Sequence, residues 1–234
     1  MLVKLVRTEK SAKNIKTFWF APEKSLDYTA GQFVEFYLPH KKPDVRGQKR
    51  WFTLSSSPSE KLISITTKQA VDRISSFKQT LFGLKNGDLV SVSEPMGDFV
   101  LPKDAQIPIV FVAGGIGITP MRSMVQWLTD IREKRNIVLI YATKTLNKFA
   151  FRKLFEKYGI RPIYVLPANI ASKSEHAGPV TGQFIQNLSH HVHSQLIYIS
   201  GPEQFTEKLE KELLDAGTPK ENLVLDFFPG YQID

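Results

Sequence analysis

Short apolar or alternating segments recur through the first hundred residues and are separated by turn signals. The turns include Ala30-Gly31, Arg46-Gly47, Asn86-Gly87-Asp88 and Met96-Gly97-Asp98. Segments of this length and spacing are typical of strands in a small antiparallel barrel or sandwich. Six strands are expected, at Leu2–Val6, Thr17–Phe20, Phe33–Leu38, Trp51–Ser55, Leu62–Thr67 and Leu89–Val92, with one short helix that starts near Ser75 and covers Phe77–Phe82.

A different pattern begins at Ile107. The segment Ile107–Ala113 is a continuous apolar run that ends in glycines, as expected of a strand buried on both faces. Segments with helical and strand spacing then alternate to the end of the chain, which predicts a parallel sheet covered by helices. The expected elements are helices at Met121–Ile131, Phe149–Tyr158, Gly182–Leu188 and Phe205–Ala216 and strands at Ile137–Ala142, Arg161–Leu166, Leu196–Ser200 and Leu223–Asp226.

These patterns predict an antiparallel β domain, either a barrel or a sandwich, over residues 1–102, followed by an α/β parallel-sheet domain over residues 103–234. The boundary is expected in the proline-marked stretch Leu101–Pro108. Apolar residues make up 42% of the chain and charged residues 23%, an ordinary globular composition. No run approaches the roughly 18 apolar residues of a membrane helix, and the first ten residues lack a signal-peptide core. A cytoplasmic protein without a membrane span is therefore expected.

The chain contains no cysteine, which excludes disulfides, thiolate zinc sites and cysteine-ligated iron–sulfur clusters. Its net charge of +8 raises nucleic acid, anionic lipid, acidic proteins and phosphate-rich ligands as partners. The charge is scattered rather than striped and no aromatic–basic RNA motif occurs, so nucleic acid is disfavoured. The histidines of the segment 190–193 point apart and have no carboxylate in register, so no metal site is expected.

A glycine-rich turn, Gly114-Gly115-Ile116-Gly117-Ile118-Thr119-Pro120, joins the first strand of the second half to its first helix. Glycines let backbone pass close to a bulky ligand. Thr119 is expected to cap the helix, with Pro120 at its first position. The N–H groups at the start of that helix would favour an anion such as a pyrophosphate. The alternative is a tight turn without a ligand, since the spacing differs from G-x-G-x-x-G.

The strand Arg50-Trp51-Phe52-Thr53 carries a cation, two aromatic rings and a hydroxyl. Strand alternation sends Arg50 and Phe52 to one face and Trp51 and Thr53 to the other. A guanidinium suits a phosphate and an aromatic can stack on a flat ring. The alternative is a surface arginine beside core aromatics. The serines Ser75 and Ser76 open the predicted helix, either as caps or as phosphate ligands.

With these motifs in order, the sequence resembles the ferredoxin–NADP reductase superfamily, and the resemblance covers nearly the whole chain. The family's R-x-[YF]-[ST] motif matches Arg50, Phe52 and Thr53, and its serine-bearing loop matches Ile74–Phe77. Its G-D-x-V-x-V-x-x-P-x-G-x-F element matches residues 87–99. The segment Gly114–Pro120 matches the pyridine-nucleotide loop, and Ser200-Gly201-Pro202 matches the later [CS]-G-P motif. Many relatives have a cysteine where this chain has Ser200.

The resemblance implies an FAD-binding barrel and an NAD(P)-binding α/β domain whose C-terminal tail returns toward the flavin. Thr53, near the flavin N5, and Phe228, as a flavin cover, would lie at the reacting centre. Tyr231 is the second choice for the cover, and core packing is the alternative. The other residues implied for the flavin are Arg50, Trp51, Phe52, Thr66, Thr67, Lys68, Ser75 and Ser76. Those implied for the nicotinamide nucleotide are Gly114, Gly115, Gly117, Thr119, Pro120, Gly201, Pro202 and Glu203.

The family's NADH-preferring members often carry an acidic residue where this chain has Lys148. Charge-assisted hydrogen bonds from basic side chains would favour the 2′-phosphate of NADPH over NADH. The candidates are Lys144, Lys148, Arg152 and Arg122, and the alternative is a solvated basic face.

The implied activity is that of a flavin-dependent NAD(P)H oxidoreductase, with hydride transfer from nicotinamide C4 to flavin N5. Electrons would then pass to a ferredoxin-like, flavodoxin-like or oxygenase partner. Such partners are commonly acidic, and a protein with a net charge of +8 would attract them by electrostatic steering. Two alternatives stay open: a reductase of free flavin or ferric chelates, and a flavin-binding electron-transfer subunit without turnover of its own.

Overall fold

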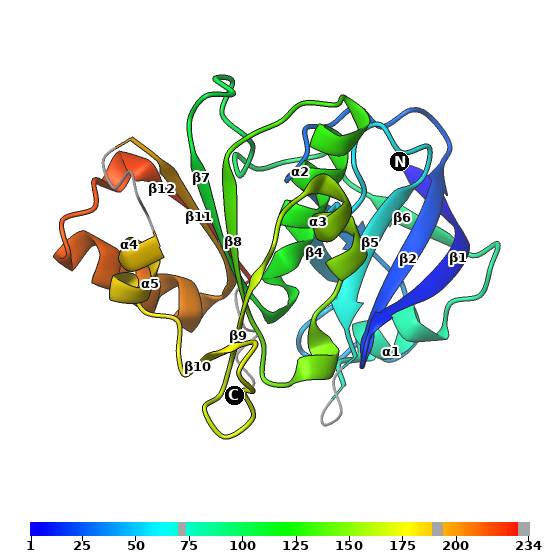
Figure 1. The fold of residues 1–234 in the computed structure, drawn as a ribbon. Coiled ribbons are helices and arrows are strands. Elements are labelled where there is room, and N and C mark those ends of the chain that lie inside the picture. The colour runs from blue at the N-terminus through cyan, green and yellow to red at the C-terminus, as the bar shows by residue number, and fades with distance from the viewer. Residues whose placement is uncertain (70–73, 189–193, 229–234) are drawn as a thin grey trace.

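The chain folds into an antiparallel sheet followed by a parallel sheet with helices on both of its faces (Figure 1). A computed structural model describes residues 1–69, 74–188 and 194–228, the last residue by its backbone alone. The antiparallel strands lie between residues 2 and 92, and the parallel strands between residues 109 and 228. The predicted fold class is therefore confirmed. The boundary predicted between residues 102 and 103 falls in the segment that connects the two sheets.

The antiparallel sheet has six strands in the order β4-β3-β6-β1-β2-β5 and closes on itself. The closure is a bridge between Leu54 and Ile65, beside a hydrogen bond of 2.8 Å from Ser55 N to Ser64 O. Large apolar side chains from all six strands fill the interior. The strands are β1 (Leu2–Ala12), β2 (Ile15–Pro22), β3 (Phe33–Tyr37), β4 (Lys49–Thr53), β5 (Ile63–Lys68) and β6 (Leu89–Val92).

Helix α1 (Ser76–Gly83) closes one end of the barrel. Its N-cap is Ser75, whose side chain accepts a hydrogen bond of 3.1 Å from the N–H of Lys78. The helix buries Phe77 and Leu81 in the barrel core. The helix predicted to start near Ser75 is confirmed.

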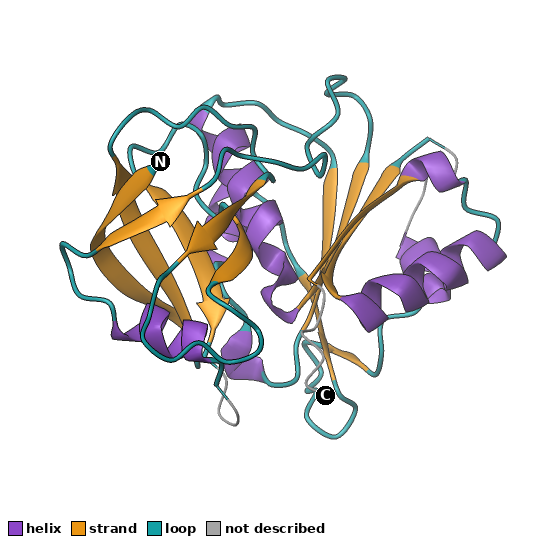
Figure 2. Ribbon diagram, turned by 180° about the vertical axis from the view of Figure 1, so that it is seen from behind, coloured by secondary structure: helices purple, strands orange, loops and turns teal. Residues whose placement is uncertain are grey.

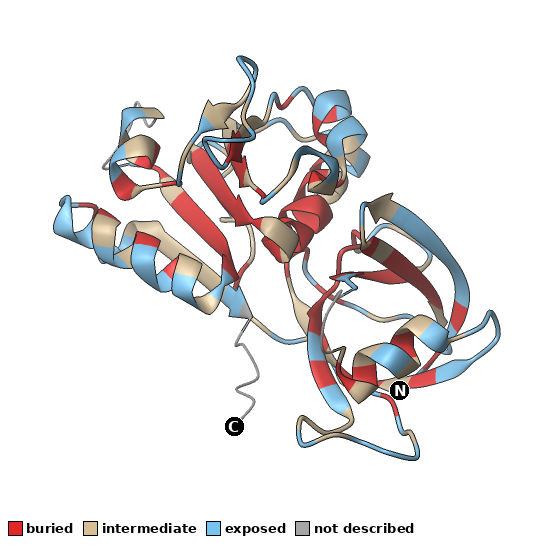
Figure 3. Ribbon diagram, turned by 90° about the horizontal axis from the view of Figure 1, so that it is seen from below, coloured by how far each residue is buried: buried red, intermediate tan, exposed pale blue. Residues whose placement is uncertain are grey.

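The parallel sheet has the order β10-β9-β8-β7-β11-β12, and helices cover both of its faces (Figure 2). Helices α2 and α3 lie between this sheet and the barrel, whereas α4 and α5 lie on the outer face. Figure 3 shows buried residues along the strands and on the helix faces turned toward them. The strands are β7 (Ile109–Gly114), β8 (Ile137–Ala142), β9 (Ile163–Leu166), β10 (His176–Ala177), β11 (Leu196–Pro202) and β12 (Leu223–Phe228). The helices are α2 (Ile118–Asp130), α3 (Arg152–Tyr158), α4 (Gly182–Leu188) and α5 (Glu203–Asp215).

The start of α2 differs from the prediction. A short 3-10 turn, Gly115–Gly117, precedes the helix, whose N-cap is Gly117 rather than Thr119. The Thr119 hydroxyl donates to Ile116 O at 3.1 Å, so it makes no cap bond to the N–H groups of the helix. Pro120 lies within the first turn, where a missing N–H costs no intrahelical bond. The predicted helix was too short because the glycines, read as a loop, continue directly into helical turns.

Candidate functional site

The glycine turn after β7 packs directly against the end of the neighbouring strand β11. A β-carbon on Gly117 would lie 2.1 Å from the carbonyl oxygen of Ser200, so no other residue fits there. Gly201 faces Gly114 in the same way, since a β-carbon on Gly201 would lie 3.2 Å from the Gly114 Cα. The two glycine motifs identified in the sequence therefore meet at the carboxyl ends of adjacent strands.

A pocket of about 700 Å³ opens beside this contact. It lies at the carboxyl ends of the parallel strands, where ligands bind in open α/β sheets. Gly114, Gly115 and Pro202 line it, while Gly117, Thr119, Pro120 and Gly201 are buried next to it. Glu203 begins helix α5 and does not line the pocket.

Four lysines line the pocket, and its described lining contains no Asp or Glu. Lys144 and Lys148 follow strand β8, Lys208 lies on α5, and Lys68 comes from barrel strand β5. Burial, together with the charges of Lys148 and Lys144, lowers the pKa of Lys68. Among the described residues only Lys208 of these four has an ion-pair partner, Glu212 at 3.6 Å. The pocket is therefore a cationic site to which both sheets contribute.

Two of the predicted phosphate ligands lie elsewhere. The guanidinium of Arg152 is 4.5 Å from the ring centroid of Tyr164 and does not line the pocket. Arg122 is buried against the barrel, where it donates to the carbonyl oxygen of Ser55 at 2.8 Å and forms an ion pair with Glu60. In the structure the Arg122 side chain therefore links helix α2 to the barrel and is not free to bind a phosphate in the pocket.

The predicted flavin strand β4 places its side chains in three different surroundings. Arg50 is 6% exposed, donates to the carbonyl oxygens of Arg46 and Lys49 at 2.5 Å each, and lies 5.1 Å from the Phe77 ring centroid. Phe52 packs in the barrel core, whereas Trp51 is 54% exposed. Thr53 is also buried, at 4% exposure.

The strand β5 contributes a buried chain of hydroxyl groups. The Oγ1 of Thr66 lies 2.7 Å from that of Thr17 and 2.9 Å from the Oγ of Ser55. Thr67 is also buried, at 5% exposure. Both threonines were expected beside the adenosine half of FAD. The Thr66 hydroxyl bonds to neighbouring strands, and Lys68, expected with these threonines, lines the pocket at the ends of the parallel strands.

The start of α1 is already occupied by a carboxylate of this chain. The N–H of Ser76 donates to Asp44 Oδ2 at 2.8 Å, and the N–H of Asp44 donates to Ser76 Oγ at 2.9 Å. The Arg46 guanidinium beside Asp44 and the bond from Ser76 hold the pKa of this carboxyl far below its usual range. Burial, followed by the charges of Lys68 and Arg50, lowers the pKa of Lys78 to about 8. A cationic cluster thus adjoins the buried Arg50.

A partly buried carboxyl that the sequence analysis did not select lies on β12, two residues before the end of that strand. Asp226 is the register partner of Ser200, whose Oγ donates to Asp226 Oδ2 at 3.1 Å. Burial raises the pKa of Asp226 to about 6. The acidic position two residues before the predicted flavin cover was the signal available for it. The side chain of Phe228 and all of Tyr231 lie outside the described residues.

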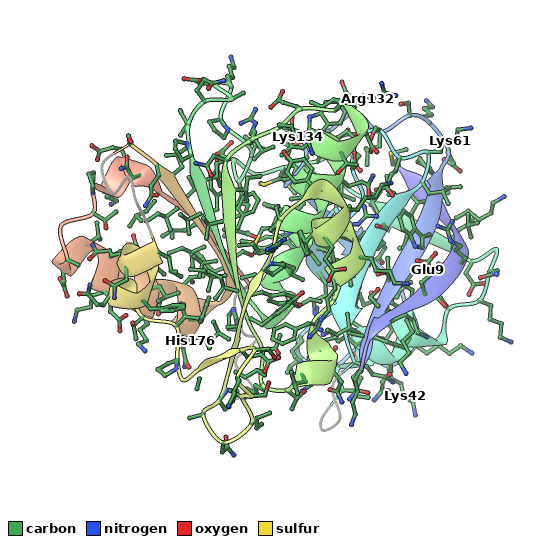
Figure 4. All side chains as sticks on the ribbon, in the orientation of Figure 1. Glu9, Lys42, Lys61, Arg132, Lys134 and His176 are labelled. Atoms are coloured by element: carbon green, nitrogen blue, oxygen red, sulfur yellow. The ribbon has the colours of Figure 1, made fainter. Side chains whose placement is uncertain are left out.

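Arg132, Lys134 and His176 do not line the pocket. Figure 4 shows Arg132 and Lys134 beyond the end of α2, and His176 at the opposite end of the parallel sheet. Within the described ranges, no group of three or more His, Cys, Asp or Glu side chains could hold a metal ion. No helix in that part of the chain is long and apolar enough to cross a membrane.

Residues 111–211 match the family of oxidoreductase NAD-binding domains. The chain is 27% identical over 243 residues to a flavohemoprotein of Bacillus cereus, a match that covers 96% of this chain and 60% of the relative. The chain thus spans about 60% of the length of that relative.

Solved structures share the fold over the whole chain. The flavohem-like FAD/NAD-binding domain of nitric oxide dioxygenase from Vibrio cholerae superposes with a TM-score of 0.82 at 19% identity, covering 98% of both chains. A ferredoxin–NADP⁺ reductase from Neisseria gonorrhoeae, with bound FAD and NADP, has a TM-score of 0.79 at 16% identity and covers 99% of this chain and 98% of its own. The family match and these superpositions show that the chain has an oxidoreductase NAD-binding domain over residues 111–211 and, over nearly its whole length, the fold of these two FAD- and NAD(P)-binding proteins.

Proposed function

We propose that this chain is a flavin-dependent NAD(P)H reductase module that passes electrons to a separate protein or domain. The observation that carries the proposal is the position of the nucleotide pocket. It is built from the glycine turn of the NAD-binding domain and from barrel residues Ile15 and Lys68. Barrel strand β5 contacts the 3-10 turn Gly115–Gly117 directly. A nucleotide in the pocket would therefore lie beside the barrel that carries the flavin motif.

FAD fits the barrel face on two observations. The guanidinium of Arg50, which comes from β4, is buried beside Phe77 near the start of α1. Lys78 on that helix adds a second cation. Two phosphates would balance this charge, because a guanidinium and an ammonium both bind phosphate oxygens. Arg50, Lys78 and Ser75 would hold the diphosphate, and Thr53 would contact the ring system. FAD would supply the hydride acceptor.

The protein's own contribution would be alignment and exclusion of water. Gly117 and Gly201 let two loops approach closely, which leaves the nucleotide diphosphate the N–H groups at the start of α2. Thr119, 2% exposed in the first turn of that helix, would lie next to the nicotinamide.

NADPH is the nucleotide that the pocket favours. Its 2′-phosphate adds about two negative charges. Three lysines that have no ion-pair partner among the described residues line the pocket: Lys68, whose pKa is lowered, Lys144 and Lys148. A charge-assisted hydrogen bond contributes about 1.5–3 kcal/mol, so two of them would discriminate strongly against NADH.

The electron acceptor is proposed to be an acidic protein or domain. The similar Bacillus protein is a flavohemoprotein, a name that indicates both a flavin and a haem, and this chain spans about 60% of its length. The net charge of +8 favours an acidic partner through electrostatic steering. Free flavin and ferric chelates are the competing acceptors.

The test is anaerobic reduction of the FAD-loaded protein by NADPH and by NADH, followed through the flavin absorbance. We expect rapid bleaching, faster or at lower concentration with NADPH. A protein that binds neither FAD nor nucleotide would contradict the proposal. A protein that binds FAD yet stays oxidised with both nucleotides would support a subunit without turnover of its own.

A further inference from the structure

Arg122 joins the first helix of the NAD-binding domain to the barrel through a buried ion pair. Its Nη1 donates to the carbonyl oxygen of Ser55 at 2.8 Å, and its Nη2 donates to Glu60 Oε1 at 3.0 Å. Nη1 also donates to Glu60 Oε2. The fork geometry of a guanidinium is needed to make these bonds at once.

Aromatic rings from both halves of the molecule flank the same guanidinium. The Cζ of Arg122 lies 5.5 Å from the ring centroid of Trp19 on β2 and 5.9 Å from that of Phe151 before α3. Phe151 has φ +61°, a left-handed conformation that is uncommon for a residue with a bulky side chain. Its surroundings therefore hold Phe151 in place, and Arg122 with it.

The ion pair is one of several contacts along a single seam. The Oγ of Ser123 donates to the carbonyl oxygen of Ser56 at 2.5 Å, and at the far end of α2 the Oγ of Ser59 donates to Asp130. The segment 55–60 thus follows α2 along its length. We call this contact the α2 seam.

The α2 seam starts close to both proposed ligands. Ser55 is two residues after Thr53, the proposed flavin contact, and Arg122 is three residues after Thr119, the proposed nicotinamide contact. A displacement of 1 Å between reacting groups can cost about 100-fold in rate. A rigid link at this point would hold the distance between the two rings.

We propose that Arg122 is a positioning residue that fixes the separation of flavin and nicotinamide through Ser55 and Glu60. This proposal rests on the proposed reductase function. Arg122 does not line the pocket and makes its bonds to Ser55 and Glu60, so its removal should leave the affinities for FAD and NADPH nearly unchanged and slow hydride transfer. A lysine retains the charge but cannot make the forked contacts, so R122K should recover only part of the rate.

The experiment compares wild-type protein with R122A, R122K and, as matched control, D130N. D130N weakens the contact at the other end of α2, far from the glycine turn. At saturating NADPH we expect R122A to reduce its flavin roughly 10- to 100-fold more slowly. The concentration of NADPH at half-saturation should change by less than about threefold, since a factor of ten needs about 1.4 kcal/mol. D130N should behave like wild type.

Two further readouts separate positioning from a loss of stability. Low concentrations of guanidinium ion, but not equal concentrations of sodium salt, should restore part of the R122A rate. Calorimetric unfolding of the flavin-free protein should show one transition for wild type and two separated transitions for R122A. An R122A protein with the wild-type rate and a single transition would overturn the proposal. A wild-type protein that binds FAD but is reduced by neither nucleotide would contradict the proposed function instead.

Discussion

Ser200 and Asp226 are register partners on neighbouring parallel strands, and the serine hydroxyl donates to the aspartate at 3.1 Å. The pair lies next to Gly117, whose missing β-carbon leaves room for the Ser200 carbonyl. A partly buried carboxyl group thus lies on the strand beside β11, whose Ser200 contacts the glycine turn. Burial raises its pKa to about 6, because the charged form loses its hydration and Ser200 returns only one hydrogen bond.

The raised pKa of Asp226 predicts a stability that depends on pH. Its ordinary pKa is 3.8, so between about pH 4 and pH 6 the folded state binds more protons than the unfolded state. Stability should therefore fall as the pH rises through this window. The full loss is at most about 3 kcal/mol, at roughly 1.4 kcal/mol per pKa unit. Urea unfolding at pH values from 4 to 8 measures it.

The control for that dependence is D226N, which keeps the shape and an acceptor for Ser200. An asparagine does not ionise, so D226N should not lose stability as the pH rises through this window. The free energy of unfolding of D226N relative to wild type should therefore rise between pH 4 and pH 7. A difference between the two proteins that is independent of pH would show that Asp226 titrates normally.

Gly117 and Gly115 should respond differently to alanine. In G117A the new β-carbon would meet the backbone of Ser200 and Gly201, so the two loops must separate. Overpacking of this kind costs about 1–3 kcal/mol. G117A should also bind nucleotide weakly, because the pocket is built on this contact.

Gly115 is the matched position, because a β-carbon there meets nothing within 4 Å. Its φ of +59° still makes alanine unfavourable by about 1–2 kcal/mol. G115A should therefore lower the free energy of unfolding while the loop contact survives. Equal nucleotide affinities of the two variants, measured by fluorescence titration, would argue against the close approach as the basis of the pocket.

Lys148 should discriminate between the two nucleotides. Removal of one charge-assisted hydrogen bond costs about 1.5–3 kcal/mol, so K148A should bind NADPH roughly 10- to 100-fold more weakly. Its affinity for NADH should change little, since NADH has no 2′-phosphate. K208A is the control, because Lys208 lines the same pocket but pairs with Glu212. Equal losses for both nucleotides in K148A would assign Lys148 to the diphosphate.

The elements that the sequence predicted well are those with a strong local signal. Alternating strands bounded by glycine turns predicted the antiparallel domain, though not whether it is a barrel or a sandwich, and Ile137–Ala142 was predicted to the residue. The short strand His176–Ala177 was missed, because two residues are too few to show the alternation of apolar and polar positions that marks a strand. The start of α2 was placed too late, since glycine favours loops unless a close contact, here with Ser200, requires it.

The candidate site was predictable only in part. The glycine turn and Ser200–Pro202 were found by motif, and the structure brings them together. The roles of Arg122 and Lys68 depend on how the barrel meets the second sheet, which no local pattern records. The guanidinium of Arg122 is a group that could bind a phosphate, but it forms an ion pair with Glu60, which is 62 residues away in sequence. Lys68 is the last residue of barrel strand β5 yet lines the pocket at the ends of the parallel strands.

The most direct test of the central claim is a single-turnover reduction with nucleotide deuterated at nicotinamide C4. The FAD-loaded protein is mixed anaerobically with labelled and unlabelled NADPH, and the loss of flavin absorbance is followed in time. Direct hydride transfer across the junction of the two sheets predicts slower bleaching with the deuterated nucleotide. Flavin that binds to the protein but is not bleached by NADPH or NADH would contradict the account.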